Sequence, residues 1–198
     1  MNIDTHLQNA FRFIRQEPLY AILGGLLVIC MNVATLGVLF GPIFGGYFIG
    51  ILKFIKEGQK PLFSDIFEGF QRVGYLFSFI LVSIFTILGF VLLVVPGLVL
   101  MTWWIYVLLI MVQTDMPVSK AMAESRKKVQ AKGFVMHFVF LMGLSIFPTF
   151  IINAVSVFLP PLKLLHLVVM PFQSACLVSL YLEQFSIGLP PPVEQIPT

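Results

Sequence analysis

The sequence predicts an all-α membrane protein with about six transmembrane helices, arranged as three hairpin repeats that each follow an amphipathic helix. Of its 198 residues, 59% are hydrophobic and 11% are charged, whereas soluble domains have about 45–50% apolar and about 25% charged residues. Several charge-free runs approach the ~20 residues that a helix needs to cross the hydrocarbon core. The basic residues fall almost entirely in alternate connections between these runs. All three observations indicate a chain whose main solvent is lipid.

Six apolar segments carry this prediction. They are residues 19–40, 42–55, 73–95, 96–112, 134–159 and 164–185. Gly41-Pro42, Pro96-Gly97 and Pro160-Pro161 separate the members of each pair, and we expect tight turns there because glycine and proline interrupt helices. The second and fourth segments are short, so re-entrant hairpins are the alternative at those places. Full spanning is favoured because Lys53 and Lys56 can reach the membrane surface with their long side chains.

The basic residues predict the orientation. Of the 12 lysines and arginines, all but Lys163 precede the first segment or lie near the connections between the second and third and between the fourth and fifth. Under the positive-inside rule these connections and both termini are cytoplasmic. The same rule gives an even number of spans.

An amphipathic helix is predicted before each pair of segments. The apolar faces are Ile3, Leu7, Phe11 and Ile14 in the first; Phe63, Ile66, Phe67 and Phe70 in the second; and Val118, Met122, Ser125 and Val129 in the third. The third helix has basic flanks that we expect to contact anionic lipid headgroups, namely Lys120, Arg126, Lys127, Lys128 and Lys132. A compatible alternative is that these helices pack on the cytoplasmic end of the bundle.

The pattern of amphipathic helix, membrane helix, turn and membrane helix predicts three repeats within one membrane domain, 1–187. The units are 1–58, 59–115 and 116–187, and repeats of a hairpin keep the same orientation. Residues 188–198 form a Pro-rich tail without periodicity, which we expect to be an extended cytoplasmic end.

Uncharged groups inside the segments predict helix packing. Gly41, Gly45, Gly46 and Gly50 form a small-residue face that allows close approach of a second helix. We expect the partner to be a helix of this chain, and a neighbouring copy is the alternative. The amides Asn32, Asn153 and Gln173 are expected to bridge helices by hydrogen bonds. A polar substrate path formed by these three residues is the second interpretation.

The sequence predicts no catalytic, cofactor-binding or metal-binding site. No phosphate-binding glycine loop, dinucleotide fingerprint or HExxH motif occurs. Cys30 and Cys176 lie in apolar runs, where cysteine behaves as a small hydrophobic residue. Glu183 is expected near the cytoplasmic end of the last segment, either in reach of water or as a proton or cation carrier. His137 is expected to be an interfacial residue, and the basic loop is too small to favour nucleic acid as a partner.

Two stretches carry a family resemblance. The first is Gly-Gly-Tyr-Phe-Ile-Gly at 45–50 with Glu-Gly-Gln-Lys-Pro-Leu-Phe-Ser-Asp-Ile-Phe-Glu-Gly-Phe at 57–70, and the second is Asp-Met-Pro-Val-Ser-Lys-Ala-Met at 115–122 with Pro96-Gly97 before it and Lys132-Gly133 after it. Together they cover about 41–135. They resemble a broad group of uncharacterised bacterial multi-pass membrane proteins, and the membrane region attached to some glycerophosphodiester phosphodiesterases is similar. The resemblance implies a bacterial inner-membrane location. It implies no activity for this chain, in which we expect no room for a soluble phosphodiesterase domain.

The function that we expect from these observations is non-enzymatic. The chain reads as a structural or accessory subunit of the inner membrane, in a homo-oligomer or a larger membrane complex, with membrane lipids as partners and no cofactor. The alternative is a small transporter, channel or lipid-handling protein with a site between the repeats.

Overall fold

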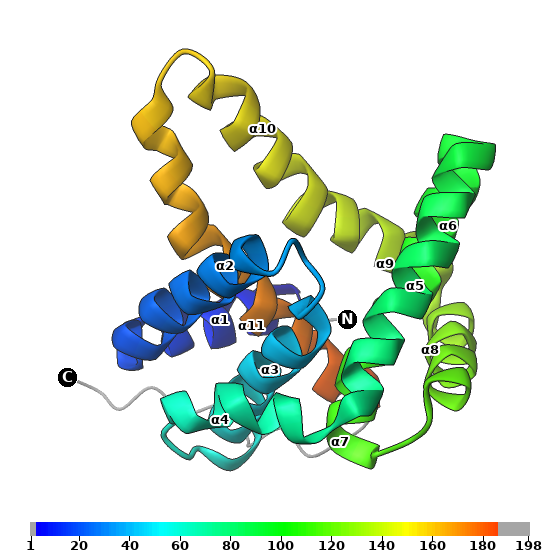
Figure 1. Ribbon diagram of the computed structural model, residues 1–198, viewed down its shortest axis with the longest axis horizontal. Coiled ribbons are helices and arrows are strands. Elements are labelled where there is room, and N and C mark those ends of the chain that lie inside the picture. The colour runs from blue at the N-terminus through cyan, green and yellow to red at the C-terminus, as the bar shows by residue number, and fades with distance from the viewer. Residues whose placement is uncertain (1–2, 186–198) are drawn as a thin grey trace.

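The computed structural model describes residues 3–185, which are all-helical apart from short connections, with no strand among them (Figure 1). The elements of the first part are α1 (Ile3–Gln16), the π-helical turn η1 (Tyr20–Gly24), α2 (Gly25–Ala34), α3 (Phe40–Glu57), α4 (Phe63–Glu68) and the 3-10 turn η2 (Gly69–Gln71). The remaining elements are α5 (Val73–Leu92), α6 (Val94–Trp103), α7 (Val107–Thr114), α8 (Val118–Lys132), α9 (Phe134–Leu141), the π-helical turn η3 (Met142–Ile146), α10 (Phe147–Ser156), the 3-10 turn η4 (Pro160–Leu165) and α11 (His166–Gln184). The predicted tail, 188–198, lies outside the described residues.

Several of these helices are long and apolar enough to cross a membrane. Within residues 3–185 there are four such stretches, Val73–Leu92, Val94–Thr114, Phe134–Ser156 and Pro160–Gln184. A fifth is obtained if α1 and Tyr20–Ala34, which meet at an angle of 98°, are counted as one broken span. The predicted all-α membrane class is therefore supported at the level of four to five spans.

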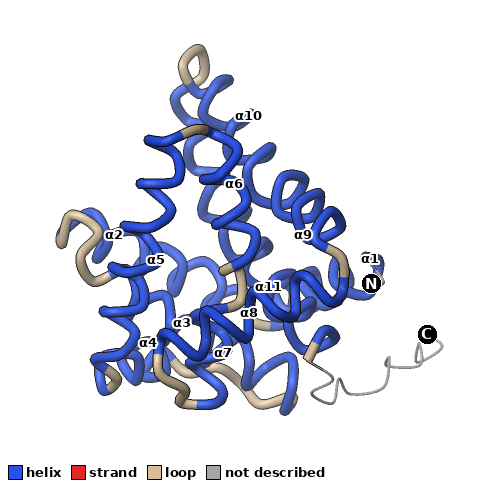
Figure 2. The backbone as a smooth tube through the Cα atoms, turned by 90° about the vertical axis from the view of Figure 1, so that its right-hand side faces the viewer, coloured by secondary structure: helices blue, strands red, loops and turns tan. Residues whose placement is uncertain are grey.

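Two long hairpins extend from a common base and diverge (Figures 1 and 2). One consists of α5 and α6, and the other of α10 and the first part of α11. The base is the opposite end of the molecule, which contains α1, α4, α7, α8 and the ends of α3 and α11. In the most apolar 18-residue window of each stretch, only 17% of the residues are buried within the chain for Val73–Leu92 and 22% for Phe134–Ser156. The apolar side chains of the hairpins therefore face outward.

Two of the three predicted turns lie elsewhere. The first connection is at residues 35–39, where Leu36 and Gly37 have φ angles of 50° and 82°, so Gly41 and Pro42 belong to the first turn of α3. The second is at Leu93, whose extended backbone precedes α6. Proline is tolerated in the first turn of a helix because the N–H groups there have no intrahelical acceptor. Pro42 and Pro96 therefore begin helices, where the prediction placed turns. Pro160 does lie at the third connection, in η4.

A break also divides the predicted fourth segment into α6 and α7. Ser125 of α8 bridges the break, because its hydroxyl donates to the carbonyl of Trp103 at 2.7 Å and accepts from the amide of Tyr106 at 3.2 Å. The guanidinium of Arg126 lies 4.2 Å from the centre of the Trp103 ring. Ser125 and Val129 are buried, as the predicted apolar face of α8 requires.

The face of α1 that packs on the bundle differs from the predicted one. His6, Ala10 and Phe13 are buried, whereas Ile3 and Phe11 are 53% and 64% exposed. The predicted hydrophobic stripe of α1 is therefore divided: Leu7 and Ile14 are partly buried against the core, whereas Ile3 and Phe11 face outward. A groove of about 750 Å³ between α1 and α9 continues this apolar surface.

Candidate functional site

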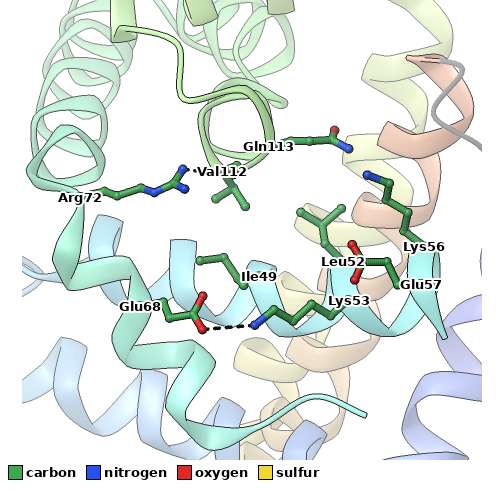
Figure 3. A pocket seen from close by; sticks show the side chains of 9 residues that line it. All are labelled: Ile49, Leu52, Lys53, Lys56, Glu57, Glu68, Arg72, Val112 and Gln113. Carbon is green, nitrogen blue, oxygen red and sulfur yellow. Dashed lines mark hydrogen bonds and ion pairs between the residues drawn. The ribbon is translucent and has the colours of Figure 1, made fainter. Parts of the chain in front are cut away.

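A pocket of about 230 Å³ lies in the base, between α3, the end of α4 and α7 (Figure 3). Charged side chains from α3, from the end of α4 and from Arg72 line this pocket together. It is lined by Ile49, Leu52, Lys53, Lys56, Glu57, Glu68, Arg72, Val112 and Gln113. The first five of these come from the predicted repeat 1–58 and the other four from 59–115, so the pocket lies between the two units.

Lys53 anchors one wall of the pocket. Its ammonium donates to Oδ1 of Asp65 at 2.7 Å and to Oε1 of Glu68 at 3.2 Å. Asp65 is 1% exposed, and its second oxygen accepts from the backbone N–H of Leu62 at 2.8 Å. A buried carboxylate is stable only when its charge is paired and its oxygens are hydrogen-bonded. Lys53 and Leu62 meet both needs, and α4 is thereby fixed against α3.

Arg72 holds the opposite wall. Its Nη1 lies 3.1 Å from Oδ1 of Asp115 and donates to the hydroxyl of Tyr75 at 3.0 Å and to the carbonyl of Val112 at 3.3 Å. These contacts join the start of α5 to the end of α7. They use one guanidinium nitrogen, and within the described chain Nη2 and Nε make no hydrogen bond.

Three further polar side chains line the pocket and have polar atoms without a partner in the described chain. Within residues 3–185, the ammonium of Lys56 and the carboxylate of Glu57 form no ion pair or hydrogen bond. The side-chain oxygen of Gln113 is buried, and no group of the described chain donates to it. Figure 3 shows Lys56 extending from α3 toward Gln113 on α7. The pocket therefore has a free cation, a free carboxylate and a free acceptor.

The charges of the pocket are nearly balanced. Lys53, Lys56 and Arg72 are its cations and Glu57 and Glu68 its anions. The buried Asp65 and the exposed Asp115 add two carboxylates behind Lys53 and Arg72. This arrangement can bind a group that carries both signs of charge, and it does not form a strong positive field.

A second polar cluster joins the two ends of the described chain. Nε2 of His6 lies 2.7 Å from Oε2 of Glu183, and Nδ1 of His6 lies 3.0 Å from the hydroxyl of Ser179. Asn9 donates to the same hydroxyl at 2.8 Å. Burial lowers the pKa of His6 below its ordinary value, and the neighbouring Glu183 carboxylate opposes that shift. This cluster fixes α1 to α11.

The five residues predicted to contact lipid headgroups, Lys120, Arg126, Lys127, Lys128 and Lys132, do not line the pocket. They lie on α8, and two of them stack on aromatic rings: Arg126 on Trp103 and Lys128 on Phe185, the latter at 5.0 Å. Lys120, Lys127 and Lys132 are exposed on the same helix. A role in lipid contact stays a prediction for all five.

The glycine face of α3 contacts elements of the same chain. A Cβ at Gly46 would collide with the backbone of Ile66, one at Gly50 with the ring of Tyr20, and those at Gly41 and Gly45 with Tyr75. The four glycines thus let α3 approach η1, α4 and α5 closely.

The three predicted path residues are not joined to one another in the structure. The amide of Gln173 donates to the carbonyl of Leu144 at 2.8 Å and so links α11 to η3. Asn153 donates to the carbonyl of Thr149 in its own helix at 2.9 Å. The side-chain oxygen of Asn32 is buried without a hydrogen bond from the described chain.

The sequence pattern does not predict this pocket. In the sequence, Lys53, Lys56 and Arg72 indicate the orientation of the chain, and no motif pairs them with Glu57 or Glu68. The available signal is a cluster of four cations and three carboxylates within residues 53–72, namely Lys53, Lys56, Lys60, Arg72, Glu57, Asp65 and Glu68. This cluster does not show that α7 closes the pocket.

Comparison with known proteins adds no relative: no family model matches the chain, and neither a curated protein nor a solved structure matches it. The resemblance carried by residues 41–135 therefore stays a prediction.

Proposed function

We propose that this chain is a non-enzymatic, structural or accessory subunit of the bacterial inner membrane. It crosses the membrane six times as three hairpin repeats, with both termini in the cytoplasm and the base at the cytoplasmic surface of the membrane. In this arrangement α3, which ends in Lys53, Lys56 and Glu57, is the short second span, and its charged end lies at the membrane surface.

The contrast between base and hairpins is the observation that supports this proposal. In the base, the ion pairs Lys53–Asp65 and Arg72–Asp115 and the polar contact His6–Glu183 each join two elements. In the hairpins, outward-facing apolar side chains extend to the tips; Val91 and Leu92 are both 75% exposed. The polar contacts hold the elements of the base together, and the diverging hairpins expose apolar side chains. Such surfaces are suited to contact with neighbouring membrane helices or lipid.

Cysteine labelling tests the orientation. Single cysteines at Lys60 and Lys127 should react with a membrane-impermeant maleimide only from the cytoplasmic side, and one at Lys163 only from the periplasmic side. The background is a variant in which Cys30 and Cys176 are replaced by alanine. Periplasmic labelling of residue 60 or 127 would disprove the six-span topology.

Mass and transport measurements test the subunit role. In mild detergent the native mass should exceed that of the 22.3 kDa monomer through self-association or a co-purifying membrane partner. The triple variant N32A/N153A/Q173A should lower the melting temperature without abolishing any transport. Loss of a transport activity by a variant that stays folded would contradict the accessory role.

A second candidate function is lipid handling. It is favoured by the pocket between the first two units, because its free polar groups lie at the ends of α3 and α7, which the proposed topology places at the membrane surface. Lipid headgroups have their charges at this depth.

A further inference from the structure

We propose that the pocket between α3, α4 and α7 binds a phosphoethanolamine group, in which a phosphate and a primary ammonium are two carbons apart. The proposal rests on the lipid-handling function above and names its ligand chemistry. The juxtaposition that carries it is a cation, a carboxylate and a buried acceptor, none of them paired within residues 3–185, around one cavity of about 230 Å³.

The phosphate half of the ligand is matched by donors on two sides. Among the described residues the ammonium of Lys56 has no partner, and Arg72 makes its contacts to Tyr75, Val112 and Asp115 through Nη1 alone, so Nη2 and Nε can donate to a ligand. Arginine and lysine both bind phosphate oxygens through charge-assisted hydrogen bonds. The existing contacts hold the Arg72 side chain in place, which reduces the entropy lost on binding.

The ammonium half is matched by acceptors on the same walls. Glu57 has a free carboxylate, and Glu68 uses Oε1 for Lys53 and keeps its other oxygen. The buried oxygen of Gln113 needs a donor, since a buried polar atom without a partner costs about 1–3 kcal/mol. A primary ammonium has three N–H donors, so it can bind a carboxylate and this amide together.

Charge balance favours a zwitterion over a simple anion. Three cations line the pocket, but two carboxylates line it as well and two more pair with Lys53 and Arg72 from behind. A phosphate alone would leave Glu57 without a partner and would be repelled by it. A ligand carrying both charges leaves neither Lys56 nor Glu57 unpaired.

Binding of four soluble probes to the detergent-solubilised full chain tests this chemistry. The probes are phosphoethanolamine, phosphocholine, inorganic phosphate and ethanolamine, each measured by isothermal titration calorimetry. Phosphoethanolamine should bind at least about tenfold more tightly than the other three, because each of them lacks a charge or the N–H donors and so loses charge-assisted hydrogen bonds. Equal binding of inorganic phosphate or phosphocholine would overturn the proposal.

Measurements with lipids distinguish whether the phosphoethanolamine group belongs to a lipid headgroup or to a free small molecule. Native mass spectrometry in micelles doped with phosphatidylethanolamine or phosphatidylglycerol counts the lipids bound to each chain. Retention of phosphatidylethanolamine over phosphatidylglycerol identifies a lipid headgroup. Binding of soluble phosphoethanolamine without such retention identifies a free small molecule. If neither form binds, the proposal is wrong.

Two variants tie the binding to the pocket, and a third is the matched control. Lys56→Gln and Glu57→Gln change side chains that make no bond to the described chain, so the fold should be kept, which a melting curve checks. Each should weaken phosphoethanolamine binding about tenfold. Glu57→Gln should in addition improve the relative binding of inorganic phosphate, since it removes a repulsive charge.

Lys60→Gln replaces an exposed lysine outside the pocket and should leave phosphoethanolamine binding unchanged. Unaltered binding in both pocket variants would place the ligand elsewhere. These results do not depend on the labelling experiment, so a failed topology and a failed ligand can be told apart.

Discussion

His6 and Glu183 meet across the two ends of the described chain, with Nε2 and Oε2 2.7 Å apart. The His6 ring is fully buried, and the Glu183 side chain is 30% exposed. The thiol of the neighbouring Cys176 lies 3.6 Å from the carbonyl oxygen of His6. The pair therefore holds an amphipathic helix against the last helix of the bundle.

Replacing His6 by alanine should destabilise the protein by about 1–3 kcal/mol, because Ser179 and Glu183 lose a buried partner. The melting temperature in detergent should fall, and α1 should separate from α11. In a Cys30→Ala background, maleimide labelling of Cys176 should become faster as its cover is lost. Gln8→Ala, on the exposed side of α1, is the control and should leave both readouts unchanged. Slow labelling in the His6 variant would show that α1 is held by other contacts.

Acidification should lower the stability of the fold through the buried His6. The pKa of His6 is lowered by burial, against the opposing effect of Glu183, from an ordinary value of 6.5. The unfolded chain therefore takes up a proton at a higher pH than the folded chain, and folding stability decreases as the pH falls below about 6.5. Above that pH the His6 contribution is constant. Melting curves between pH 8 and pH 5 should show this loss for the natural protein and a smaller loss for His6→Gln. Identical pH profiles for the two proteins would assign the effect to other groups.

A methyl group at Gly46 should be poorly tolerated. Its Cβ would collide with the backbone of Ile66, which cannot rotate away as a side chain can. Gly46→Ala should cost about 1–3 kcal/mol, the usual range for overpacking. Gly143→Ala is the matched control, since nothing lies within 4 Å of its added carbon and alanine is the better helix former. Thermal unfolding should therefore occur earlier for the first variant and at the same or a higher temperature for the second. Equal melting temperatures would mean that α3 and α4 can move apart at no cost.

Lys53→Met should destabilise the base because it leaves the carboxylate of Asp65 buried with only the Leu62 amide as partner. We expect a loss of about 2 kcal/mol, less than for a fully buried pair since the lysine is partly exposed. The double variant K53M/D65N should be more stable than K53M, because the unpaired charge is gone while the amide oxygen still accepts from Leu62. Lys60→Met is the control for loss of a surface lysine. A double variant less stable than K53M would contradict the role of Lys53 as the counter-ion of Asp65.

Local patterns in the sequence predicted the helical class and most element positions. Apolar runs of about 20 residues and amphipathic stretches identify helices without any knowledge of their neighbours, and the all-helical prediction is confirmed. The turn positions were less predictable. Pro42 and Pro96 are compatible with a turn and equally with the first turn of a helix, and the choice depends on the preceding residues: Leu36 and Gly37 in one case and Leu93 in the other.

By itself the sequence determined that this chain is helical, that its apolar segments are suited to lipid and that its basic residues gather in a few connections. These properties follow from composition and period, which are local. Only the tertiary structure decided which face of α1 is buried, that His6 meets Glu183, and that Lys56, Glu57 and Gln113 surround one pocket. Such contacts join residues of different helices that are far apart in the sequence. The sequence pattern does not show which helices lie next to each other in space.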